Sequence, residues 1–142
     1  MRNLARIIGS LSLWASATVA LAHHGDAGRF EDELTTITGT VVALQLINPH
    51  SSVLLSVTDD SGKAVTWRVE MEAPQRLQSA FGWSRSTLPP GTRITVTGRR
   101  IKSGAPDLNV TERARILLTD SCKEIYHSRD LEPLGDQAGS CS

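Results

Sequence analysis

The chain has 142 residues, with 15 basic and 15 acidic side chains and only six aromatic residues. This length is typical of one ordinary domain. Mixed, near-neutral charge excludes the basic face that nucleic-acid binding requires, and six aromatic residues are too few for a platform that stacks single strands. We therefore expect no nucleic-acid partner and no attraction to a charged membrane surface.

The first 22 residues have the three parts of a secretory signal peptide. Arg2 and Arg6 form a positive start, residues 7–21 are mostly apolar or small, and Ala20 and Ala22 give a small-x-small cleavage site. The alternative is a retained membrane anchor, but the apolar stretch falls short of the roughly twenty residues that span a bilayer. We expect cleavage after Ala22, a periplasmic or secreted protein, and no membrane anchor in the mature chain.

The mature chain would comprise three parts. Residues 23–33 are acidic and contain glycine, which is typical of an irregular arm; residues 34–118 form the body; residues 119–142 are a polar tail. Without Arg2 and Arg6, 13 basic residues stand against 15 acidic ones, a net charge of about −2. No repeat or low-complexity segment indicates a second domain.

Both cysteines, Cys122 and Cys141, lie in the tail. In an oxidising compartment an isolated pair is most simply a disulfide, and one that closes a loop of about twenty residues stabilises by roughly 3 kcal/mol. The alternative is a pair of reactive or metal-binding thiols, although the spacing is not C-x-x-C. We expect the disulfide to hold the tail in place.

Apolar residues of the body alternate with a period of two, which predicts β-strands. In the first strand the alternation changes phase between Val41 and Val42, which indicates a bulge or sharp bend. Two strands around residues 53–57 and 65–71 flank a turn at residues 59–62 and predict an antiparallel hairpin.

The second half of the body adds one helix and two strands. Pro74 suits a first helical turn and Gly82 suits the position after the last turn, which predicts a helix over residues 74–81. Further strands are expected around residues 94–98 and 110–118. The order β-β-β-α-β-β, with a bent first strand, predicts a mostly β protein with a small five-stranded OB-like barrel over residues 34–118. An open sandwich of five or six strands is the alternative.

Ten short motifs are each weak signals, but their order and spacing along the chain are together specific. They are Ala22-His23-His24, Thr38–Val41, Asn48-Pro49-His50, Trp67 with Glu70, Ala73-Pro74, Gly82-Trp83, Leu88, Pro90-Gly91, Thr95–Gly98 and Lys102–Gly104. Through them the chain resembles an uncharacterised family of small exported bacterial proteins, a domain of unknown function (DUF family 6152), over roughly residues 20–118. Ser51 and Ser52 depart from the aromatic or aliphatic residue that the family often has there. The resemblance implies export and a small β-barrel, and it implies no enzyme activity.

The new amino terminus is a candidate metal site. His23 would carry both a terminal amine and an imidazole, with His24 adjacent and His50 as a third ligand, and such nitrogen sets favour Cu(II) or Ni(II). His50 follows the first strand and His23 precedes it, and a strand of about twelve residues spans roughly 40 Å, so the arm would have to fold back. The alternative is an exposed chain end with no fixed ligand.

A second candidate site lies at the mouth of the expected barrel. In OB folds the loops between the first two and the last two strands flank the binding face, and here they carry His50, Lys102 and Asp107. The alternative for Asn48-Pro49-His50 is a purely structural turn. Trp83 is expected at the barrel end, where its indole N–H can reach a partner.

No acid–base pair for catalysis is recognisable. Glu70 is expected to face solvent beside Arg68, without a second carboxylate in reach. The sequence therefore predicts an exported, non-enzymatic binding or interaction module for a small ligand or a periplasmic protein. A copper- or nickel-binding protein that uses His23, His24 and His50 is the alternative, and an enzyme with His50 as base is a third.

Overall fold

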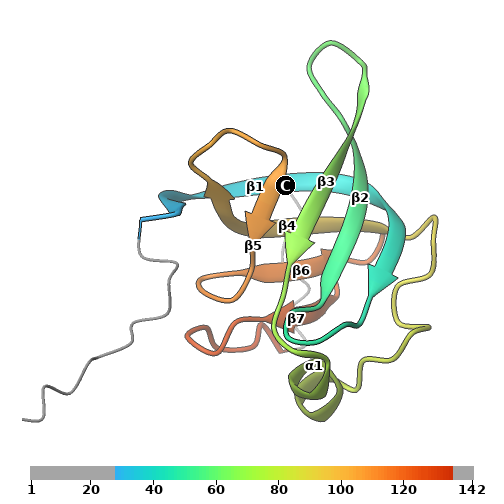
Figure 1. Ribbon diagram of the computed structural model, residues 1–142. Helices are drawn as coiled ribbons and strands as arrows, with labels where there is room; N and C mark the ends of the chain where they lie inside the picture. The colour runs from blue at the N-terminus through green and yellow to red at the C-terminus, as the bar shows by residue number, and fades with distance from the viewer. Residues whose placement is uncertain (1–27, 136–142) are drawn as a thin grey trace, which may run out of the picture.

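The long first strand, β1 (Phe30–Gln45), follows two sides of the barrel in the computed structural model, which describes residues 28–135 (Figure 1). Its first part pairs with β4 (Arg93–Ile101) and its last part with β2 (Ser52–Thr58). The register against β2 shifts between Val41 and Ala43, and the extra residue, Val42, is exposed. The predicted phase change is therefore a β-bulge, which bends the strand so that both pairings are possible.

The strands close into a ring. β2 and β3 (Ala64–Glu70) form the predicted hairpin, β3 pairs in parallel with β5 (Asp107–Asn109), and β5 pairs with β4, which returns to β1. The order β1-β2-β3-β5-β4-β1 is a closed five-stranded barrel. The predicted OB-like barrel is confirmed, and the open sandwich is not observed.

Of the last predicted strand, residues 110–118, only the end is a strand in the structure, and the strand that closes the barrel lies before it, in β5. β5 ends at Asn109 and β6 (Arg115–Leu118) pairs with a different part of β4. Between them Arg113 has a φ of 49°, and the Ala114 N–H donates to the Ser128 side-chain hydroxyl instead of continuing the ladder. The chain therefore leaves the extended conformation between the two short strands.

The region predicted as a polar tail supplies a further strand, β7 (Glu124–His127), which pairs with β6. Its residue Tyr126 is fully buried, and the Tyr126 hydroxyl donates to the Val110 carbonyl at 2.7 Å. The core of the protein therefore extends beyond residue 118, where the sequence analysis ends the barrel.

The helix α1 (Pro74–Phe81) lies at the lower end of the barrel in Figure 1 and buries Leu77 in the core. It ends at Gly82, whose φ of 70° is the left-handed conformation that glycine adopts at low cost. The predicted helix and its stop residue are confirmed.

Candidate functional site

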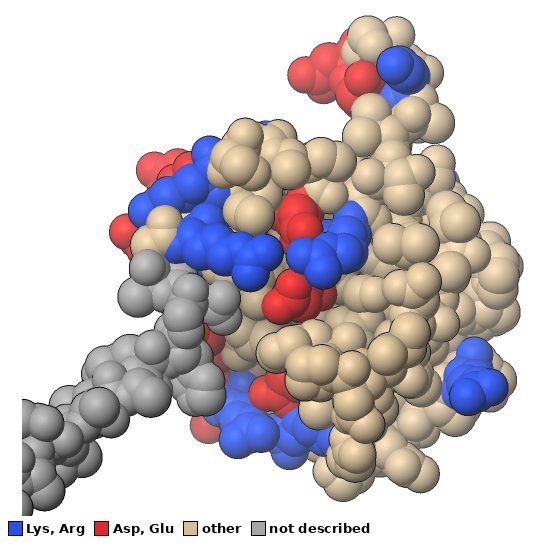
Figure 2. Space-filling model, in the orientation of Figure 1, with Lys and Arg blue, Asp and Glu red and all other residues tan. Residues whose placement is uncertain are grey.

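Four polar side chains meet on the outer face of β3. They are His50, Arg68, Glu70 and Asp107, which we call the β3 site. The site lies between the β1–β2 loop (residues 46–51) and the β4–β5 loop (residues 102–106). Figure 2, in the orientation of Figure 1, shows acidic and basic side chains gathered where β3 and β5 face the viewer, whereas the right-hand side of the surface is almost free of charge.

Glu70 is buried although it points outward. The residue is only 9% exposed, and the prediction of a solvent-exposed carboxylate is wrong. The Ser51 N–H donates to the Glu72 carbonyl and the Met71 N–H donates to the Ser51 carbonyl, so the β1–β2 loop is fixed along the end of β3. This loop brings His50 Nδ1 to 4.0 Å from Glu70 Oε1, while Arg68 Nη2 lies 3.1 Å from Oε2.

Arg68 joins Glu70 to Asp107 at the start of β5. Arg68 Nε donates to Asp107 Oδ2 at 2.8 Å, and Nη2 lies 2.6 Å from the same oxygen. Burial alone would lower the pKa of the Arg68 guanidinium, but the hydrogen bond and charge of Asp107, followed by the charge of Glu70, raise it above its ordinary value. Arg68 is therefore a permanent cation held between two carboxylates.

His50 presents one ring nitrogen to the protein, and its other ring nitrogen has no hydrogen-bond partner among the described residues. It follows a cis peptide bond between Asn48 and Pro49, and its Nδ1 lies 3.3 Å from the Met71 carbonyl oxygen. A carbonyl can only accept, so Nδ1 carries the proton and the lone pair of the neutral ring is on Nε2. The side chain is 53% exposed. His50 is thus an oriented nitrogen donor at the edge of the site.

The other two predicted ligand-binding residues lie apart from this group. Lys102 is exposed and its backbone N–H donates to the Arg29 carbonyl; within residues 28–135, no hydrogen bond or ion pair joins its side chain to the β3 site. Trp83 is buried directly after α1, at the end of the barrel where the helix lies, as expected. The structure therefore links His50 and Asp107, through Glu70 and Arg68, but neither Lys102 nor Trp83.

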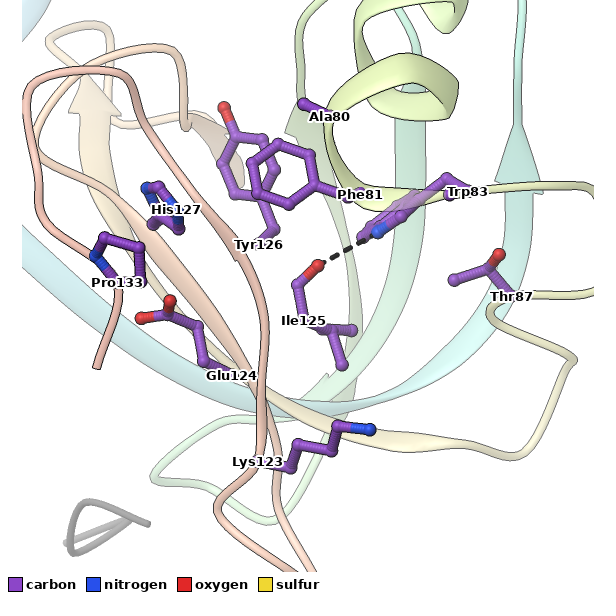
Figure 3. A pocket seen from close by; sticks show the side chains of 11 residues that line it. Ala80, Phe81, Trp83, Thr87, Lys123, Glu124, Ile125, Tyr126, His127 and Pro133 are labelled. Atoms are coloured by element: carbon purple, nitrogen blue, oxygen red, sulfur yellow. Dashed lines mark hydrogen bonds between the residues drawn. The ribbon is translucent and has the colours of Figure 1, made fainter. Parts of the chain in front are cut away.

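Trp83 borders a second depression, between α1 and β7 (Figure 3). Its volume is ≈ 430 Å³, and aromatic side chains line much of it. The Trp83 indole N–H already donates to the Ile125 carbonyl at 2.9 Å, and the Glu124 carboxylate pairs with Arg115. Thr87, Lys123 and His127 also line the depression, so it offers polar as well as apolar contacts. The β3 site, where charged and titratable side chains from three segments of the chain meet, is the stronger candidate.

Arg68 and Glu70 are the site residues that the sequence analysis misses as ligand-binding residues. The signal that could have found them is the pair of opposite charges two residues apart, which a strand places on the same face. Three predicted residues, His23, His24 and Cys141, lie outside the described residues, so the amino-terminal metal site and the disulfide of Cys122 stay predictions.

Two further findings concern only the described part of the chain. No group of three or more histidine, cysteine, aspartate or glutamate side chains within it could hold a metal ion. Nor does it contain a helix that is long and apolar enough to cross a membrane.

The fold and the site define a small OB-like barrel with a polar site on its β3 face. Residues 12–108, more than half of the chain, match a family of unknown function (DUF6152), and the chain belongs to this family. The match includes all four residues of the β3 site and ends before β6 and β7. Comparison with curated proteins and with solved structures finds no match.

Proposed function

We propose that the protein is an exported binding module that holds a small ligand at the β3 site and catalyses no reaction. The observation that carries this proposal is the nearly buried Glu70, held between Arg68 and the half-exposed ring of His50. A structural ion pair explains Arg68 with Asp107. It does not explain an oriented histidine whose second nitrogen has no partner within residues 28–135 and could contact a ligand.

The position of the site also supports binding. OB folds use the face of strands two and three, between the β1–β2 and β4–β5 loops, to hold their ligands. Here His50 comes from the first loop and Asp107 directly follows the second. Ligand contacts would therefore come from segments that are far apart in sequence but are fixed to β3 by hydrogen bonds and ion pairs.

The charges of the site favour binding over catalysis. Glu70 and Asp107 both contact the guanidinium of Arg68, so each carboxylate is already paired with a cation and neither is a free acid or base. Export to the periplasm or the medium is supported by the signal-peptide pattern of residues 1–22.

The test uses protein exported by a bacterial host and purified with its native amino terminus. A panel of small polar metabolites is screened without added metal, and binding is followed by thermal shift and calorimetry. We expect at least one saturable ligand whose affinity falls tenfold or more in His50→Ala and in Asp107→Asn. The control is Arg85→Met, in an exposed loop away from the site.

Two outcomes would contradict the proposal. One is a ligand that binds equally well to His50→Ala, Asp107→Asn and the unmodified protein. The other is reproducible turnover of a substrate that a single substitution abolishes.

A further inference from the structure

The depression between α1 and β7 has the size and the aromatic lining of a small-molecule site. Its volume of ≈ 430 Å³ lies within the range of about 300–1,000 Å³ that is typical of such sites. Trp83 is 3% exposed and Tyr126 is fully buried, so these two rings form its floor. The rings of Phe81 and His127, which are partly exposed, lie beside them (Figure 3).

Direct contacts hold these rings together. The Phe81 ring centroid lies 5.1 Å from the Tyr126 centroid and 5.3 Å from the His127 centroid. The Trp83 and Tyr126 centroids are 6.3 Å apart. The Phe81–His127 and Trp83–Tyr126 pairs meet edge to face, which is an arrangement that aromatic rings prefer. A ligand ring bound here would therefore join an aromatic cluster that is already formed.

β7 has a bulge at the depression. The register of β6 against β7 shifts, so that Ile125 is an extra residue between the paired residues Glu124 and Tyr126. The Ile125 carbonyl accepts the Trp83 indole N–H at 2.9 Å, which connects two segments that are 42 residues apart in sequence. Bulges are over-represented beside active sites, where they re-aim side chains. The bulge thus fixes the wall that β7 contributes.

The depression carries a positive charge that no carboxylate compensates. Lys123 and Glu124 both line it, and the Glu124 carboxylate is paired with Arg115 and also accepts the Leu134 N–H at 3.3 Å. The exposed Lys123 ammonium has no ion pair within residues 28–135. A ligand anion would therefore gain a cation without displacing a carboxylate.

The charged side chains around the Tyr126 ring do not oppose an anion. Four of them act on its hydroxyl, namely Glu72, Arg76, Asp130 and Arg129. Arg76 and Arg129 share the Glu72 carboxylate at 3.1 and 3.2 Å. Asp130 accepts the Arg113 backbone N–H at 2.9 Å and also lies near the Arg113 charge. Three guanidinium groups are therefore present for two carboxylates.

We infer that this depression is a second binding site, separate from the β3 site, for an organic carboxylate that carries an aromatic ring. The ligand ring would pack on Phe81 and on the floor rings, and its carboxylate would accept hydrogen bonds from the Lys123 ammonium. Thr87 is a further donor, because its oxygen accepts the Ser84 N–H and its own proton stays available. Residues 123–127 and Pro133 lie beyond the family match, so part of this site comes from outside the matched region.

The test is a titration with phenylacetate, followed by calorimetry and by the NMR resonance of the Trp83 indole N–H. We expect saturable binding that shifts this resonance and leaves the resonances of the β3 site unchanged. Phenylacetamide keeps the ring but has no charge, and acetate keeps the charge but has no ring. Both should bind more weakly than phenylacetate by about fivefold or more, since an exposed charge contact contributes up to about 1 kcal/mol.

Variants separate the charge from the ring contact. Lys123→Gln should lower the affinity for phenylacetate about fivefold without changing that for phenylacetamide, and Lys123→Arg should keep both. Phe81→Leu should lower the affinity for both compounds. Lys63→Gln is the matched control, because this exposed lysine belongs to the β2–β3 turn at the opposite end of the molecule from α1 (Figure 1). Urea unfolding of each variant confirms that the fold is retained.

The inference is overturned if phenylacetate shows no saturable binding, or if Lys123→Gln binds it as tightly as the unmodified protein does. His50→Ala and Asp107→Asn should leave phenylacetate binding unchanged, so the proposed function is judged on its own variants. A loss of phenylacetate binding in His50→Ala would assign this compound to the β3 site and would also overturn the inference.

Discussion

Replacing Arg68 by methionine should destabilise the protein by about 2–3 kcal/mol at neutral pH. The guanidinium makes close contacts to two carboxylates, at 2.6 and 2.8 Å to Asp107 and at 3.1 Å to Glu70. Methionine keeps the apolar stem but removes the charge, and the Glu70 and Asp107 side chains, 11% and 15% exposed, then lose their shared cation.

The size of the effect follows from the exposure of the three groups. Breaking a fully buried ion pair costs about 3–5 kcal/mol, whereas an exposed pair contributes about 0–1 kcal/mol. The carboxylates are nearly buried, but the Arg68 side chain is 43% exposed, so water can reach part of the space that it leaves. The cost should therefore lie below the value for a fully buried pair and well above that for a surface pair.

Urea unfolding followed by tryptophan fluorescence measures this difference, because Trp67 and Trp83 both pack in the barrel. Arg85→Met is the control and should stay within about 0.5 kcal/mol of the unmodified protein. In a double-mutant cycle with Asp107→Asn, the coupling with Arg68 should exceed about 1 kcal/mol. An Arg68→Met variant that is no less stable than the control would refute the description of the site as an ion-paired unit.

Three further predictions concern the barrel. Burial raises the pKa of Tyr126, the only tyrosine, so no phenolate absorbance should appear near pH 10 while the protein is folded. The contribution of Tyr126 to the free energy of unfolding should be complete below pH 10 and should fall above it, because the unfolded chain loses the phenolic proton first. Phenolate absorbance that appears near pH 10 in the folded protein would contradict this. Gly98→Ala should cost about 1–3 kcal/mol in urea unfolding, because its Cβ would lie 2.6 Å from the Asn109 carbonyl oxygen, and an unchanged midpoint would be the contrary result. Ser51→Ala should leave the free energy of unfolding unchanged or raise it by up to about 1 kcal/mol, since the buried hydroxyl has no hydrogen-bond partner among the described residues. A loss of more than about 1 kcal/mol would contradict this, because it would mean that the hydroxyl makes a hydrogen bond.

The sequence was sufficient for the features that depend on neighbouring residues. The phase change at Val41 and Val42 located the bulge, and the turn at residues 59–62 located the hairpin. Pro74 and Gly82 marked the two ends of the helix. Each of these signals depends on only a few neighbouring residues, so it can be recognised without knowing what the segment packs against.

The features that the sequence did not predict depend on distant partners. β7 has only four residues, and it is held by pairing with β6 and by the Tyr126 hydroxyl on Val110. The burial of Glu70 depends on where the β1–β2 loop lies, which is set by backbone hydrogen bonds at Ser51. Neither the short strand nor the buried carboxylate has a local pattern that distinguishes it from a polar segment.

The same limit explains why the separation between the start of β1 and His50 is larger when it is measured along the strand than when it is measured around the barrel. Measured along β1 they lie at opposite ends of a strand, and a strand is rigid. Around the barrel, the circuit that leaves β1 at Leu34 returns to it at Gln45, after passing Glu70 on the way. One bulged residue, Val42, belongs to that circuit, because it allows β1 to pair with β4 before the bend and with β2 after it. The closed ring, and not the strand length, therefore determines which parts of the chain can share the β3 site.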